Sequence, residues 1–122
     1  MKAWLNAQTA ALDGVWTGLQ PVERPAGLDA VGLAAHARGL PNGAQITAAL
    51  QGTALHPEAP DGAWTTLATL VCTEEAPAAG LVGQALVVVL GCRFLRWSLR
   101  HVGAAGLSDL HLVMAGDLAA QE

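Results

Sequence analysis

The sequence predicts an α+β protein, a small two-layer sandwich in which helices cover one face of a short sheet. Apolar residues recur at helical spacing near the N-terminus and again over residues 77–103, whereas residues 45–53 alternate between polar and apolar side chains. A chain of 122 residues with both patterns favours a single domain, residues 1–122. An all-α fold is the alternative, because residues 64–73 and 85–91 fit a helix as well as a strand.

Two helices are expected at the N-terminus. Over residues 2–19, the apolar residues at the spacing of one helical face are Leu5, Leu12, Trp16 and Leu19. Pro21 ends this helix, because proline lacks the backbone N–H that continues a helix. A second, shorter helix is expected over residues 29–39, with Asp29 as its N-cap and Gly39 as its stop signal.

A β-hairpin is expected over residues 45–73. In its first strand, residues 45–53, polar and apolar residues alternate with the period of two of a half-buried strand. The segment 56–62 contains two prolines and a glycine and predicts a turn. Residues 64–73 are rich in Thr, Val and Leu, which favours a second strand, although three threonines of this segment also share one helical face.

One long helix is expected over residues 77–103, crossing to a third strand near residues 110–114. The run Ala76–Cys92 carries no charged residue, which indicates a buried element. Three consecutive valines, Val87–Val89, leave an alternative in which a buried strand ends at Gly91 before a shorter helix. The crossing helix would place the second and third strands parallel to each other.

The composition indicates that part of the surface is covered by a partner. Charged residues make up 13% of the chain, against about 25% in a typical soluble domain. Part of the apolar surface is therefore expected to face a partner, and a homodimer is the simplest arrangement. The net charge of −4 argues against nucleic-acid binding. The heavy use of Ala, Gly, Leu and Arg is typical of a bacterial gene of high GC content.

The sequence predicts a cytoplasmic protein. Its N-terminus soon turns polar and lacks the long apolar region of a secretory signal. Cys72 and Cys92 both end apolar runs and are expected to be buried thiols in a reducing compartment. The run Ala76–Cys92 is shorter than a membrane span and contains Pro77 and Gln84, so a membrane-associated subunit is the least favoured interpretation.

Positive charge is concentrated at the end of the expected long helix. On a helical wheel Arg93, Arg96 and Arg100 fall within about 60° of one another. Trp97 and His101 flank them. Because arginine binds carboxylates bidentately and stacks on tryptophan, this face is expected to bind an acidic segment of a partner protein. A solvated helix face, with arginines near the helix C-terminus, is the alternative interpretation.

The chain carries no motif that indicates a particular chemistry. Its four histidines lack metal-ligand spacing, and no nucleophile motif or nucleotide-binding glycine loop is present, so no metal or cofactor is expected. His56 and Asp61 share one loop, and His111 lies on the third expected strand. These three side chains are the candidate polar groups of a pocket between the sheet and the long helix.

The sequence therefore favours a non-enzymatic accessory, adaptor or chaperone-like protein. It would bind a partner protein through an apolar surface and the arginine face of residues 93–101. The alternative is a small enzyme or small-ligand-binding domain that uses the pocket between sheet and helix.

Overall fold

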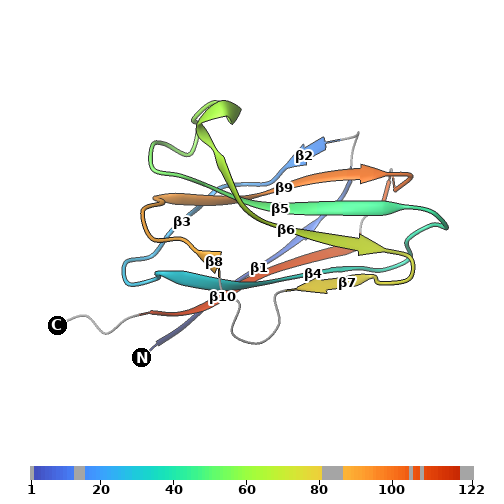
Figure 1. Cartoon of the computed structure of the whole chain (residues 1–122), viewed down its shortest axis with the longest axis horizontal. Helices are drawn as coiled ribbons and strands as arrows, with labels where there is room; N and C mark the ends of the chain where they lie inside the picture. The colour runs from blue at the N-terminus through green and yellow to red at the C-terminus, as the bar shows by residue number, and fades with distance from the viewer. Residues whose placement is uncertain (1, 13–15, 81–86, 105, 108, 119–122) are drawn as a thin grey trace.

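The computed structural model is a sandwich of two antiparallel β-sheets (Figure 1). It describes residues 2–12, 16–80, 87–104, 106–107 and 109–118. Within these ranges the one helical element is a single 3₁₀ turn, Asp61–Ala63. The expected α+β sandwich with N-terminal helices and a long crossing helix is therefore wrong, and so is the all-α alternative.

The first sheet contains the first and the last strand of the chain. Its strand order is β1–β10–β4–β7, and β8 also pairs with β4. The bounds are β1 (Lys2–Ala10), β4 (Ala30–Ala37), β7 (Ala78–Gly80), β8 (Val87–Val88) and β10 (Leu110–Leu118). Residues 110–114 do form a strand, as expected, but this strand lies antiparallel between β1 and β4 rather than parallel to the hairpin.

The second sheet contains the expected hairpin. Its strand order is β2–β9–β5–β6, and β3 also pairs with β9. The bounds are β2 (Trp16–Gly18), β3 (Val22–Glu23), β5 (Gln45–Thr53), β6 (Thr65–Thr73) and β9 (Phe94–Val102). Antiparallel pairing of β5 with β6 confirms the hairpin, with one register shift between Leu50 and Gln51. On its other side β5 pairs with β9 along all nine residues.

The core lies between the two sheets and is built by alternation along the central strands. Successive side chains of a strand point to opposite faces, so every second residue enters the core. The buried residues are Val31, Leu33, Ala35 and Ala37 on β4, Ile46, Ala48 and Leu50 on β5, Leu95, Trp97 and Leu99 on β9, and Leu110, Leu112 and Met114 on β10. These residues fill the space between the inner faces, as in other sandwiches.

The expected N-terminal helices are strands. In these segments every second side chain is buried or half-buried, which is the period of a strand and not of a helix. In β1 the side chains of Trp4, Asn6 and Gln8 are half-buried, while Leu5 faces outward and is 67% exposed. Burying one helical face would have required Leu5 inside. Residues 29–39 likewise contain β4, in which every second side chain from Val31 onward is buried.

The expected long helix is divided among three strands. Residues 77–103 contain β7, β8 and β9, and residues 81–86 lie outside the described part of the chain. Gly91 lies in the turn before β9 and has a φ of 98°. Residues other than glycine rarely adopt this backbone conformation. Among the described residues no helix is long and apolar enough to cross a membrane.

Gly116 on β10 lies against the backbone at the start of β4. A Cβ atom at this position would lie 2.6 Å from the carbonyl oxygen of Ala30 and 2.7 Å from Cδ1 of Leu28. The first of these atoms belongs to the backbone, so the strand itself would have to move. The close approach of β4 to β10 thus requires glycine here.

We expect Gly116→Ala to lower the free energy of unfolding by about 1–3 kcal/mol, because overpacking forces a backbone shift. Urea unfolding followed by tryptophan fluorescence measures the change. Gly62→Ala is the matched control, since a Cβ there meets nothing within 4 Å. Equal stability of the two variants would contradict the packing at Gly116.

Candidate functional site

The structure separates the five residues of the expected arginine face. β9 is a strand, so its side chains alternate between the two faces of the second sheet. Arg96 and Arg100 point outward, Trp97 is fully buried in the core, and the half-buried His101 pairs with the inward-facing Ile46. Arg93 precedes β9 in an exposed turn, where its guanidinium lies 5.6 Å from the ring centroid of Phe94. Arg96 and Arg100 therefore share one surface, without Arg93, Trp97 or His101.

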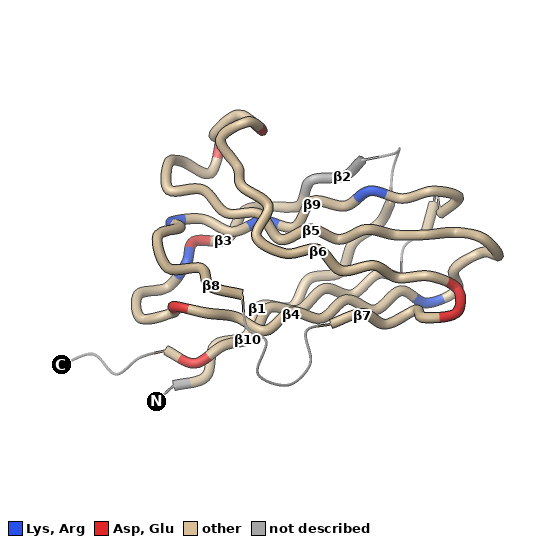
Figure 2. The backbone as a smooth tube through the Cα atoms, viewed as in Figure 1, with Lys and Arg blue, Asp and Glu red and all other residues tan. Residues whose placement is uncertain are grey.

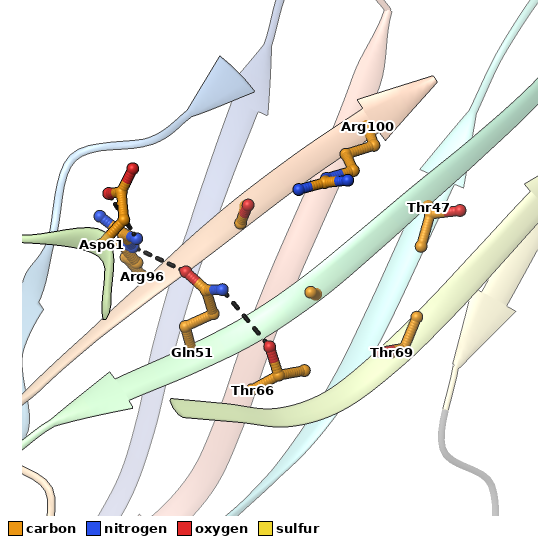
Figure 3. A pocket seen from close by; sticks show the side chains of 9 residues that line it. Thr47, Gln51, Asp61, Thr66, Thr69, Arg96 and Arg100 are labelled. Atoms are coloured by element: carbon orange, nitrogen blue, oxygen red, sulfur yellow. Dashed lines mark hydrogen bonds and ion pairs between the residues drawn. The ribbon is translucent and has the colours of Figure 1, made fainter. Parts of the chain in front are cut away.

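These two arginines line a polar cleft on the outer face of the second sheet (Figure 3). The cleft has a volume of about 480 Å³. Its lining residues come from β5, β6, β9 and the loop that joins β5 to β6: Thr47, Ala49, Gln51, Asp61, Thr66, Thr69, Arg96, Ser98 and Arg100. Hydroxyl, amide and guanidinium groups thus surround a recess with a single carboxylate.

Arg96 is held rigidly at one end of the cleft. Its Nε donates to Oε1 of Gln51 at 2.8 Å, and its Nη2 donates to Oδ1 of Asp61 at 3.1 Å. The guanidinium also stacks on Trp64, with 4.3 Å between Cζ and the ring centroid. Gln51 in turn donates to the hydroxyl of Thr66 at 3.3 Å (Figure 3). Arg96 therefore holds the β5–β6 loop against the sheet through its contacts with Asp61 and Trp64.

The ion pair contributes less to this anchor than the stacking and the bond to Gln51. The Arg96 side chain is only 10% exposed, but that of Asp61 is 77% exposed. Water and salt screen such a half-exposed pair, whose contribution is at most about 1 kcal/mol. A cation stacked on a buried ring contributes about 1–2 kcal/mol. The Trp64 ring is itself buried, and its Nε1 donates to the carbonyl of Ala59 at 3.1 Å.

Arg100 lies at the other end of the cleft. It is exposed, and among the described residues it forms no hydrogen bond or ion pair. In Figure 3 its guanidinium extends along β9 toward the end of the cleft that holds Arg96. Its nearest cross-strand neighbour on β5 is Thr47. The site thus combines one fixed cation, Arg96, with one cation, Arg100, that is exposed and has no ion pair with a described residue.

The structure does not bring the three expected pocket residues, His56, Asp61 and His111, together. Asp61 lies in the cleft, but His56 is exposed in the same loop, where its Nδ1 accepts from the backbone N–H of Glu58 at 3.1 Å. His111 lies on the outer face of the opposite sheet, 2.7 Å from Oδ1 of Asp109. The described residues contain no group of three or more His, Cys, Asp or Glu placed to hold a metal.

Neither cysteine is an activated nucleophile. Cys72 is fully buried and Cys92 is half-buried, and both are free thiols. Desolvation by burial raises the pKa of Cys72, although the backbone at Ala37 and Ala79 partly opposes the shift. Burial also raises the pKa of Cys92, and the nearby charge of Arg24 opposes this only in part.

Sequence reasoning missed most of the cleft lining. Four hydroxyl residues on three strands take part: Thr47, Thr66, Thr69 and Ser98. The sequence did contain an indication of these four residues. In an alternating strand pattern the polar residues mark the outer face of the strand. Applied to β9, the same period of two would have grouped Ser98 with Arg96 and Arg100.

The fold and the cleft define a β-sandwich with a positively charged polar recess on one sheet. No protein-family model, curated protein or solved structure matches the chain. The side chains of the recess are therefore the features from which a function can be inferred.

We expect Arg96→Met to lower the free energy of unfolding by about 2 kcal/mol, because it removes the stacking on Trp64 and the bond to Gln51. Asp61→Asn should cost less than about 1 kcal/mol, since Asp61 is exposed. Arg100→Met, which removes no hydrogen bond or ion pair with a described residue, is the control. Urea unfolding of the three variants tests this order, and a larger loss for Asp61→Asn than for Arg96→Met would contradict it.

We expect both thiols of the folded protein to react more slowly than free cysteine with a disulfide reagent at pH 8. A raised pKa lowers the thiolate fraction at that pH, and the thiolate is the reacting form. Cys92, which is partly exposed, should react before Cys72. Absorbance measured with and without urea gives the two rates. Native rates equal to the unfolded rates would refute the burial of the thiols.

Proposed function

We propose that this protein is a non-enzymatic adaptor that binds an acidic segment of a partner protein in the cleft of the second sheet. The observation that carries the proposal is the exposed guanidinium of Arg100 beside a recess lined by hydroxyl and amide groups. An arginine fork binds a carboxylate with two parallel hydrogen bonds. The threonine hydroxyls beside it can donate to the same segment or accept from it.

The charge distribution of the cleft supports an acidic ligand. The chain as a whole has ten acidic residues against six basic ones. Within the cleft the order is reversed, because two arginines face one carboxylate, and that carboxylate is bound to Arg96. An acidic segment would therefore meet an excess of positive charge here, which gives selectivity more than affinity.

The cleft gives little support to the enzymatic alternative. General acid–base catalysis requires titratable groups within hydrogen-bonding reach of one substrate. Among the described residues that line the cleft, Asp61 is the one such group, and His56 and His111 lie elsewhere. Among the described residues that line the cleft, no histidine or lysine stands beside the hydroxyls to activate them.

The proposal includes a cytoplasmic location. Two free thiols support it, since unpaired cysteines are typical of proteins that work in a reducing compartment. The partner would then be another protein of the same compartment.

We expect a glutamate-rich synthetic peptide to bind in the cleft at low salt. In nuclear magnetic resonance titrations of the labelled full chain, the backbone signals of Thr47, Ser98 and Arg100 should move. Arg100→Gln should weaken binding about tenfold, the effect of losing one charge-assisted hydrogen bond.

Arg93→Gln is the matched control, because Arg93 carries the same charge outside the cleft. It should leave the affinity unchanged. A glutamine-rich peptide of the same length should not bind. If the glutamate-rich peptide moved no cleft signal, or if Arg93→Gln weakened binding as much as Arg100→Gln, the proposed function would be rejected.

A further inference from the structure

We propose that β1 pairs edge to edge with β1 of a second copy of this chain, giving a two-fold symmetric dimer with one continuous sheet across the interface. β1 is an edge strand of the first sheet. This strand pairs with β10 through all nine residues from Lys2 to Ala10, and no described strand pairs with its other side. A strand edge of this kind presents a row of backbone donors and acceptors that another strand can satisfy.

The other sheet edges carry features that hinder pairing. At the far side of the first sheet, β7 and β8 have only three and two residues. At one side of the second sheet, β2 and β3 are equally short. The remaining edge strand, β6, has nine residues, but its pairing with β5 is interrupted by a register shift and it lies beside β7 of the other sheet (Figure 1). Short length, irregularity and coverage are the usual protections of an edge.

Among the described residues nothing gives β1 any of these protections. It is nine residues long, its register with β10 is regular, and it contains neither proline nor glycine. From Ala3 to Ala10 it carries no charged residue, whereas charges elsewhere lie mainly near turns and strand ends (Figure 2). Lysines or prolines would be expected on an edge that must stay unpaired.

The strand is complementary to itself, which identifies the partner as a second copy. An antiparallel pair with its two-fold axis at Asn6 places Leu5 opposite Ala7 of the partner subunit. The single charged residue, Lys2, comes opposite Ala10 of the partner subunit, so no like charges face each other. A closed two-fold interface uses the same surface on both copies, and this pairing does so.

Side chains on both faces of β1 support this register. On the outer face Leu5 is 67% exposed and would be covered by the partner strand. On the inner face the half-buried Asn6 accepts a hydrogen bond from Gln8 at 2.9 Å, and its own amide N–H₂ donates to no described residue. At the axis this amide would face Asn6 of the partner subunit, which offers an acceptor.

The test is the mass in solution, measured by size-exclusion chromatography with light scattering over a wide range of concentrations. The parent chain should run as a dimer, at twice 12.5 kDa. The double variant Leu5→Lys/Ala7→Lys should run as a folded monomer, because it sets lysines directly opposite each other across the axis. Circular dichroism checks that the fold is kept.

Leu55→Lys/Leu90→Lys is the matched control, since both leucines are exposed and lie away from β1. It should remain dimeric. A parent chain that is monomeric at every concentration would overturn the proposal, and so would a Leu5→Lys/Ala7→Lys variant that remains dimeric.

Cysteine crosslinking tests the register of the β1–β1 pair independently of the stability of the dimer. Paired positions in an antiparallel ladder have Cα atoms about 4.5–5.5 Å apart, which a disulfide can span. Asn6→Cys should therefore form a crosslinked dimer on mild oxidation, while Thr9→Cys should not. Crosslinking at Thr9 instead of Asn6 would reject the register.

Arg100→Gln should leave the dimer intact, so failure of the cleft proposal and failure of this one are distinguishable.

Discussion

The uninterrupted pairing of β9 with β5 determines the rest of the structure. Nine consecutive residue pairs, from Gln45 opposite Val102 to Thr53 opposite Phe94, fix which side chains of both strands face inward. The same ladder that sends Trp97 into the core sends its neighbours Arg96 and Ser98 to the outer face. A shift of one residue would place arginines in the core and the tryptophan in water, so this register is strongly specified. The cleft is therefore a direct consequence of how the core is filled.

The two outward arginines of β9 have different roles because their surroundings differ. Arg96 is covered by the β5–β6 loop, and its guanidinium is bound by Gln51, Asp61 and the ring of Trp64. A charge so poorly exposed must be bound on several sides, since an unpaired buried charge is strongly destabilising. Arg100 is four residues further along and has no such cover. Its exposed guanidinium suits the binding proposed for the cleft.

The sequence predicted those elements in which polar and apolar residues contrast. The hairpin of residues 45–73 and a strand at 110–114 were found because their alternation is clear. β4 was missed because alanine occupies positions on both of its faces, so the period of two is nearly invisible there. Over residues 93–100 the spacing of Arg93, Arg96 and Arg100 matches a helical face by coincidence. In β9, Leu95, Trp97 and Leu99 alternate as a strand requires. The contribution of Asp61 and Trp64 to the cleft depends on how a loop folds back, which no local pattern encodes.

The pairing of the first strand with the last has a consequence for synthesis on the ribosome. β1 and β10 are adjacent in the sheet but are separated by about a hundred residues of chain. At about 5–20 residues per second, the nascent chain presents β1 for about 5–20 s before its neighbour emerges. During that interval both edges of the strand are open, and chaperones that hold extended segments would find it accessible. Completion of the first sheet is therefore a late event, and truncation before β10 would leave a chain prone to aggregation.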